Sequence, residues 1–161
     1  MPDTYTQVYI HMVFAVKLRQ FMIKPSFSGH LERYITGIVQ KKGSKIMAIK
    51  TMPDHMHLLV SLNPNASVSD LARDIKACSS GYIKKAFNCN LFSWQTGYGA
   101  FSYSKSQLKQ VAGYIQKQEE HHRQKSFKEE YMKILMDFGV EYDEKYLFTW
   151  ISDVEEGEAS N

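Results

Sequence analysis

The sequence predicts an α+β fold, in which a ferredoxin-like antiparallel sheet carries helices on one face and is followed by helices toward the C-terminus. The main observation is the order of the segments, β-α-β-β-α-β-α-α, whose first part matches the split βαβ arrangement. The second is size and composition. A chain of 161 residues with 43% hydrophobic and 23% charged side chains can form one domain with its own core. This composition excludes disordered and fibrous proteins.

The first half of the chain contains four predicted elements. They cover residues 4–17 (strand), 26–43 (helix), 44–52 (strand) and 55–62 (strand). The strand segments are rich in β-branched and aromatic residues, whereas the helical segment places its apolar residues at a spacing of three and four. The Pro53-Asp54 pair favours a turn between the second and third strands.

The second half contains the remaining four elements. They cover residues 68–87 (helix), 97–103 (strand), 105–123 (helix) and 126–138 (helix). The first of these helices has a clear start, because Ser67 and Asp70 have the spacing of a capping box. Glycines in the strand permit close approach of another backbone.

Charge and composition limit the class of protein. The net charge is +3, and it becomes +7 over residues 1–152 when the acidic residues of DVEEGEASN (153–161) are set aside. We therefore expect one domain over 1–152, an acidic flexible tail over 153–161 and a polyanionic partner. No segment is apolar enough to span a membrane, and only Cys78 and Cys89 are present. A cytoplasmic protein without a membrane partner is expected.

The sharpest local pattern is His55-Met56-His57 within a predicted strand. Side chains alternate between the faces of a strand, so His55 and His57 point the same way while Met56 points into the opposite layer. Two imidazoles in this arrangement can bind a divalent metal ion. The alternative is that both are polar residues on the solvated face of an edge strand.

A second pattern lies in the helix predicted over 105–123. Tyr114 and Gln118 are four residues apart and project from the same face, which flanks the apolar stripe. Gln118 could supply a neutral oxygen as a third metal ligand and leave positions open for a substrate phosphate. The alternative is that Tyr114 is a tyrosine half-packed at the border of a helix. His121 and His122 could extend the site, although a solvated helix end is the simpler interpretation.

A tyrosine, a divalent metal and a basic domain together indicate phosphoryl transfer on nucleic acid. A tyrosine hydroxyl can attack a phosphodiester and conserve the bond energy in a phosphotyrosine, so that rejoining needs no nucleotide cofactor. Arg73, Lys76 and Lys84 share a stripe on the helix over 68–87 that suits contacts with nucleic-acid phosphates, although a solvated face would look similar. His11 could lie beside the site on a neighbouring strand, although a structural role is favoured.

Four segments resemble a known family, the single-tyrosine HUH transposases of the insertion sequence 200/605 group. They are YIHMVFAVKLR (9–19), MPDHMHLLV (52–60), FSWQTGYGAFSYS (92–104) and GYIQKQEEHHRQKSFKEEY (113–131). The resemblance implies that His55 and His57 are metal ligands, that Gln118 is the third ligand and that Tyr114, on a C-terminal helix, is the nucleophile. It also implies Mg²⁺ or Mn²⁺ as cofactor, single-stranded DNA beside hairpins as substrate, and a homodimer.

The predicted function is therefore DNA cleavage and rejoining through a 5′-phosphotyrosine. Two alternatives share the fold: a domesticated transposase that processes repeat hairpins, and a non-catalytic hairpin-binding protein. An unrelated metal-site protein is a further possibility. The strand over 97–103 contains glycine and aromatic residues but no charge, so as an edge strand it is expected to pair with a second copy, which would bury Tyr98, Phe101 or Tyr103.

Overall fold

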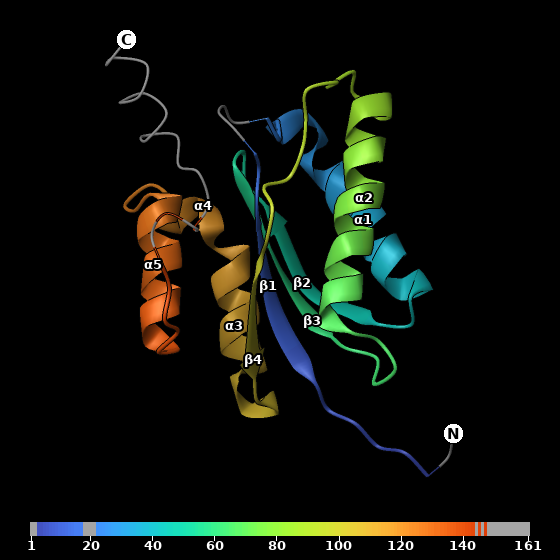
Figure 1. The fold of residues 1–161 in the computed structure, drawn as a ribbon, viewed down its shortest axis with the longest axis vertical. Helices are drawn as coiled ribbons and strands as arrows, with labels where there is room; N and C mark the ends of the chain where they lie inside the picture. The colour runs from blue at the N-terminus through green and yellow to red at the C-terminus, as the bar shows by residue number, and fades with distance from the viewer. Residues whose placement is uncertain (1–2, 18–21, 144, 146, 148–161) are drawn as a thin grey trace.

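A computed structural model describes residues 3–17, 22–143, 145 and 147 of the chain. The helices and strands follow the predicted order up to the fourth strand (Figure 1). The elements are β1 (Tyr9–Ala15), α1 (Pro25–Lys41), β2 (Lys45–Thr51), β3 (His55–Ser61), α2 (Val68–Ala86), β4 (Gly99–Tyr103), α3 (Leu108–Gln116), α4 (Gln118–His121) and α5 (Phe127–Asp137). The acidic tail expected over 153–161 lies outside the described residues.

The four strands form one antiparallel sheet in the order β2-β3-β1-β4. The split βαβ arrangement requires this order. The two strands that α1 connects, β1 and β2, have β3 between them, and the two strands that α2 connects, β3 and β4, have β1 between them. β1 and β3 are the two inner strands, so their side chains are covered on both faces. The predicted α+β fold is therefore confirmed.

Helices α1 and α2 pack together on one face of the sheet, as predicted. Met12, Phe14, Met56 and Leu58 point from the inner strands into this layer and form the main core with apolar residues of the two helices. The start of α2 is as predicted, because the Ser67 hydroxyl accepts a hydrogen bond from the Asp70 backbone N–H at 3.0 Å.

The helices that follow β4 cover the other face of the sheet (Figure 1). Val111 and Ile115 of α3 pack on Leu59, while Phe127 and Tyr131 of α5 pack in the cluster that contains Phe101. The polar residues of this second face are therefore enclosed between the sheet and a helical layer. None of the helices that the structure describes is long and apolar enough to cross a membrane.

One predicted helix is interrupted. The segment 105–123 was expected to be continuous, but it consists of a 3₁₀ turn over Lys105–Gln107, then α3, a break at Lys117, and α4. The Lys117 backbone N–H bonds to the carbonyls of Gly113 and Tyr114, which ends α3. Because residues 116–121 offer no apolar side chain that could hold a straight helix on the sheet, the chain turns and directs Gln118 inward, where it is fully buried.

Candidate active site

β3 holds two histidines on the face of the sheet covered by the C-terminal helices. The Nε2 atoms of His55 and His57 lie 3.6 Å and 2.9 Å from Glu130 Oε1, and both side chains are fully buried. Met56 points into the opposite layer, as strand alternation requires. Because β3 is an inner strand, the alternative of two histidines on a solvated edge is excluded.

His11 on β1 lies next to this pair. Its Nε2 is 2.8 Å from His57 Nδ1, the two rings stack with centroids 5.0 Å apart, and the side chain is buried. The sequence favoured a purely structural role for His11. In the structure His11 also contacts the site directly and orients the ring of His57. The His11 Nδ1 atom is buried without a hydrogen-bond partner.

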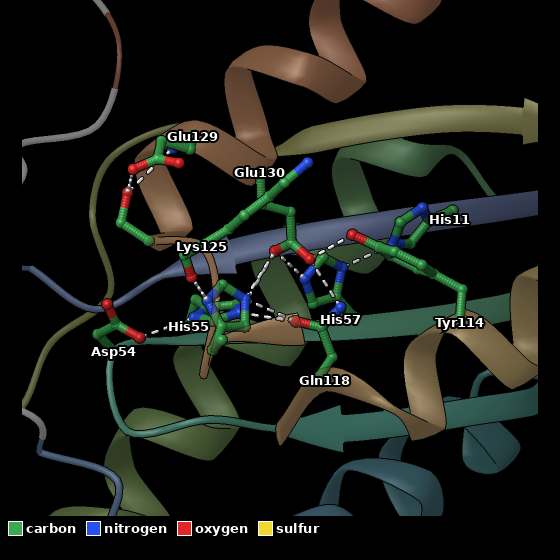
Figure 2. A network of polar contacts seen from close by, with 11 residues as sticks. His11, Asp54, His55, His57, Tyr114, Gln118, Lys125, Glu129 and Glu130 are labelled. Carbon is green, nitrogen blue, oxygen red and sulfur yellow. Dashed lines mark hydrogen bonds and ion pairs between the residues drawn. The ribbon is translucent and has the colours of Figure 1, made fainter. Parts of the chain in front are cut away.

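Tyr114 and Gln118 reach the same place from the helical side (Figure 2). Tyr114 is half-buried, as expected for a residue that flanks the apolar stripe of α3. Gln118 Oε1 lies 3.1 Å from His55 Nε2, and Gln118 Nε2 donates to Glu130 Oε2 at 2.8 Å. The structure thus brings Tyr114 and Gln118 together with both histidines of β3.

Glu130, at the centre of the cluster, was not predicted from the sequence. Its Oε1 is 2.9 Å from His57 Nε2 and 3.1 Å from His122 Nε2, and its Oε2 accepts the Tyr114 hydroxyl. The sequence did contain a signal for Glu130. Glu130 interrupts the apolar stripe of α5 that contains Phe127 and Tyr131, and a carboxylate on a buried stripe requires polar partners.

His122 is the second residue that sequence reasoning misplaced. It was assigned to a solvated helix end, but its side chain is only 12% exposed and its Nε2 lies 2.9 Å from Gln118 Oε1. Its spacing of four from Gln118 was the available signal, the same spacing that paired Tyr114 with Gln118. The adjacent His121 ring stacks on Tyr114 with centroids 4.6 Å apart.

The ionisable side chains of the site shift one another's pKa values. Burial alone would raise the pKa of Glu130, but hydrogen bonds from His122 and His57 outweigh it and hold that pKa far below its usual range. Burial lowers the pKa of His57, against the hydrogen bond from Glu130. Burial and the negative charge of Glu130 raise the pKa of Tyr114, so without a cation the tyrosine is a neutral phenol.

The donor set fits a divalent metal ion. His55, His122 and Glu130 each offer one ligand atom, and these atoms all lie within 4.8 Å of one another. Gln118 adds an amide oxygen beside two of them. Imidazole nitrogen and carboxylate or amide oxygen are common ligands of divalent ions.

An open cleft gives access to Tyr114. It has a volume of about 550 Å³ and lies between α3 and α5. Tyr114, His122 and Glu130 line its inner side. Lys125 lines the cleft and contributes positive charge, whereas the charge of Lys133 is offset by its ion pair with Asp137 at 2.8 Å. A substrate in this cleft would reach both the tyrosine hydroxyl and the polar cluster.

Comparison with known proteins identifies the family of the chain. The family described as "Transposase IS200 like" matches residues 4–118, a segment that includes both strand histidines, Tyr114 and Gln118. The chain belongs to this family. The ISDra2 transposase TnpA of Deinococcus radiodurans is 25% identical, over 70% of this chain and 84% of the relative.

Solved structures agree with the fold of this IS200-like family member. A Deinococcus radiodurans R1 structure described as a transposase has a TM-score of 0.59 at 22% identity, over 72% of this chain and 94% of that one. A REP-associated tyrosine transposase, solved bound to a REP hairpin, has a TM-score of 0.57 at 17% identity, over 74% of this chain and 72% of that one. Both likenesses show the fold.

The basic residues predicted to bind DNA lie away from the cleft, on α2 across the sheet. Arg73 pairs with Asp70 and Asp74 at 3.2 Å and 3.5 Å, so its charge is largely offset. Lys76 donates to the backbone carbonyls of Gln95 and Gly97, which ties α2 to the segment before β4. Lys84 is exposed near the end of α2. The structure therefore does not bring these three residues together with the site.

Proposed function

We propose that this IS200-like family member cleaves and rejoins single-stranded DNA beside hairpins, with Tyr114 as the nucleophile. The observation that carries the proposal is the meeting of the Tyr114 hydroxyl with His57, Gln118 and Glu130 at the inner side of an open cleft. A nucleophile needs a positioned hydroxyl, a partner for its proton and access to the substrate, and this site has all three.

The reaction is a transesterification at phosphorus. The Tyr114 oxygen forms a bond to the scissile phosphorus, the bond from phosphorus to the 3′ oxygen breaks, and the products are a 5′-phosphotyrosine and a free 3′-hydroxyl. The Tyr114 proton leaves along its hydrogen bond to Glu130, while the 3′ oxygen takes up a proton. Reversal with a second 3′-hydroxyl rejoins the strand, so no nucleotide cofactor is consumed.

His55, His57 and Gln118 would hold a divalent ion, Mg²⁺ or Mn²⁺, in this proposal. Such an ion, when bound, polarises the scissile phosphate and stabilises negative charge on its oxygens. Neighbouring residues orient the two histidine ligands. The Asp54 carboxylate accepts a hydrogen bond from His55 Nδ1 at 2.7 Å, and His11 contacts the ring of His57, so both imidazoles have fixed positions.

Hairpin recognition is proposed for a surface separate from the cleft. A structural relative was solved with a REP hairpin, which favours hairpin DNA as a ligand of the shared fold. We place Lys84, with Arg73 and Lys76 nearby on α2, at this surface. Because phosphate contacts bind any sequence, Lys84 would supply affinity while the cleft performs the chemistry. Arg73 and Lys76 would contribute only by exchanging their contacts within the chain for DNA phosphates.

We also propose a homodimer formed through β4. This strand lies at the edge of the sheet, and Ala100 and Ser102 on it are exposed. The sequence analysis expected a second copy to bury Phe101, among other residues. Phe101 is instead buried under α5 of its own chain, so a second copy is not needed to cover it. The open backbone edge of β4 is what a second copy would pair with.

The alternatives share this fold and differ in chemistry or purpose. A domesticated transposase that processes repeat hairpins would have the same site and the same adduct, with different DNA. A non-catalytic hairpin-binding protein would bind the DNA without forming an adduct. The buried cluster around Glu130 favours a catalytic protein, because buried polar groups are costly where no function needs them.

The proposed function is tested with single-stranded DNA from the flanks of the protein's own gene. Wild-type protein with Mn²⁺ is expected to give a covalent protein–DNA adduct on denaturing electrophoresis, and chelation should abolish it. Tyr34→Phe, on α1 across the sheet, should form the adduct normally. Binding without any adduct would identify the non-catalytic alternative.

The matched variant is Tyr114→Phe, which removes only the hydroxyl. It should keep the fold and the DNA affinity of the wild type, with a slightly lower melting temperature from the lost hydrogen bond to Glu130, while adduct formation falls by about a thousandfold or more. An adduct formed by Tyr114→Phe at the wild-type rate would show that another residue is the nucleophile.

A further inference from the structure

Two imidazoles in the site have their tautomers set by partners that can only accept. His55 Nδ1 lies 2.7 Å from the Asp54 carboxylate, and His122 Nδ1 lies 2.9 Å from the backbone carbonyl of Lys125. Both Nδ1 atoms must therefore carry the hydrogen. In the neutral rings the lone pairs lie on Nε2, and both Nε2 atoms face polar atoms of Gln118 and Glu130.

The atoms that these lone pairs face are also acceptors. Gln118 Oε1 lies 3.1 Å from His55 Nε2 and 2.9 Å from His122 Nε2, and Glu130 Oε1 lies 3.1 Å from His122 Nε2. The amide of Gln118 is oriented by its N–H bond to Glu130 Oε2. When both imidazoles are neutral, four acceptor atoms thus converge in a buried space. A proton on His122 Nε2, which then donates to Glu130, relieves part of their repulsion, and a divalent cation bound by the four atoms would also offset it.

The separations are those of ligands around one ion. Neighbouring ligands at about 2.1 Å from an octahedral ion are about 3.0 Å apart. In the cluster, Gln118 Oε1 lies 2.9 Å from His122 Nε2 and 3.1 Å from His55 Nε2, and Glu130 Oε1 lies 3.1 Å and 3.6 Å from the same two atoms. The cluster therefore needs little rearrangement to bind a cation.

We propose that His122 and Glu130 are ligands of the divalent ion, in addition to the residues expected from β3 and from Gln118. This inference rests on the proposed function, since it concerns the same ion. The two added ligands come from the C-terminal segment: His122 directly follows α4, and Glu130 lies in the first turn of α5. The metal site is therefore completed by residues beyond the segment matched by the family, which ends at residue 118.

Glu130 would also connect the ion with the nucleophile. One oxygen of its carboxylate faces the imidazoles, and the other accepts the Tyr114 hydroxyl. A single rigid side chain thus fixes the tyrosine relative to the ion. The position is also strongly buried, with Glu130 only 5% exposed, so the carboxylate has few other arrangements available.

A site with several imidazoles and one carboxylate suits Mn²⁺ better than Mg²⁺. Imidazole binds later first-row metals more strongly, whereas Mg²⁺ prefers oxygen ligands and retained water. Mn²⁺ is therefore the probe of choice, and its binding can be followed by calorimetry and by the loss of the free-ion signal in electron paramagnetic resonance. Neither measurement depends on catalytic activity.

The test measures Mn²⁺ affinity in protein stripped of metal. Glu130→Gln keeps the shape of the side chain and removes its charge, and His122→Asn removes the imidazole of a partly exposed residue. Each variant should bind Mn²⁺ at least tenfold more weakly than the wild type. The matched control is Glu129→Gln, the neighbouring exposed glutamate on α5, which should bind as the wild type does.

The outcomes separate this inference from the proposed function. If His55→Ala abolishes Mn²⁺ binding while Glu130→Gln and His122→Asn, folded by circular dichroism, bind like the wild type, the added ligands are refuted and the proposed function stands. If the wild type binds no Mn²⁺, the metal site of the proposed function fails as well. Weakened binding in both variants and normal binding in Glu129→Gln support the inference.

Discussion

His11 is a neutral histidine held next to a second histidine in the interior. Burial lowers the pKa of His11 to about 3, and the neighbouring His57 adds to the effect while Glu130 opposes it. The folded protein therefore takes up fewer protons than the unfolded chain between about pH 3 and 6.5. Stability contributed by the neutral form is complete above pH 6.5 and is lost as the pH falls through this window.

The expected result is a free energy of unfolding that decreases on acidification of metal-free protein from pH 7 to pH 5. His11→Gln should flatten this dependence by up to one proton, or about 1.4 kcal/mol per pH unit. Denaturant unfolding at a series of pH values measures the slope. His30→Gln, on the exposed face of α1, is the control. An unchanged slope in His11→Gln would show that His11 does not titrate in this way.

The site residues differ in how far the sequence could predict them. His55 and His57 follow strand alternation, which was enough to place both on one face. Tyr114 and Gln118 have helical spacing, but they lie on separate helices and meet the histidines because the chain turns at Lys117. Glu130 comes from another element, and no local pattern says which side chain it will meet. Only the packing of α5 against the sheet brings it to the histidines.

At the scale of elements, the position of Glu130 depends on how α5 begins. The Ser126 hydroxyl caps this helix by accepting the backbone N–H of Glu129 at 3.2 Å, and Phe127 of its first turn stacks on His55. The same kind of cap begins α2, where Ser67 accepts from Asp70. The two caps are alike in chemistry, but only one of them adjoins the site.

Ser126→Ala and Ser67→Ala form a matched pair for this reason. Each should lower the free energy of unfolding by about 1 kcal/mol, because each removes one cap. Only Ser126→Ala should also weaken Mn²⁺ binding, since it loosens the turn that positions Glu130. Thermal unfolding and calorimetry on both variants make the comparison. Equal metal affinities in the two would show that α5 does not position a ligand.

The elements themselves were largely predictable. β-branched runs, apolar spacing and the Ser67 cap placed the first two helices and three of the strands within about two residues of their observed ends. The first strand was predicted too long, over 4–17, because β1 covers only Tyr9–Ala15. The break at Lys117 was not predictable, because the polar segment around it has good helix formers and lacks Gly and Pro. Tertiary contacts decide it, as Gln118 turns inward to the cluster around Glu130.

At the scale of the whole molecule, the sheet separates two surfaces. The cleft with Tyr114 lies under α3 and α5, whereas the exposed basic residue Lys84 lies on α2 across the sheet. A DNA ligand that used both surfaces would pass around the domain. If the proposed function holds, substitutions on α2 are therefore expected to change affinity without changing the chemistry.

Lys84→Ala tests the binding surface. It should weaken the binding of hairpin DNA and reduce the slope of log affinity against log salt by up to about 1, which is the loss of one phosphate contact. Cleavage of DNA that is fully bound should be unchanged. Lys45→Ala, on β2, is a control for a general loss of charge. A wild-type salt slope in Lys84→Ala would remove α2 from the interface.

The edge strand makes a prediction about assembly. If β4 pairs with a second copy, the wild type should sediment as a dimer at micromolar concentration, and Ala100→Lys should sediment as a monomer because a lysine there opposes strand pairing. Met47→Lys, exposed on the opposite edge strand β2, should remain a dimer. A monomeric wild type would refute the proposed homodimer.

The central claim is that Tyr114 becomes covalently attached to DNA, and peptide mapping of the adduct tests it most directly. Wild-type protein is incubated with single-stranded DNA from the flanks of its gene and with Mn²⁺, the adduct is digested with nuclease and trypsin, and the peptides are identified by mass spectrometry. Tyr114 is the only tyrosine in the tryptic peptide 110–117. The account predicts that this peptide carries a nucleotide attached through its 5′ phosphate. A nucleotide on any other peptide would contradict it.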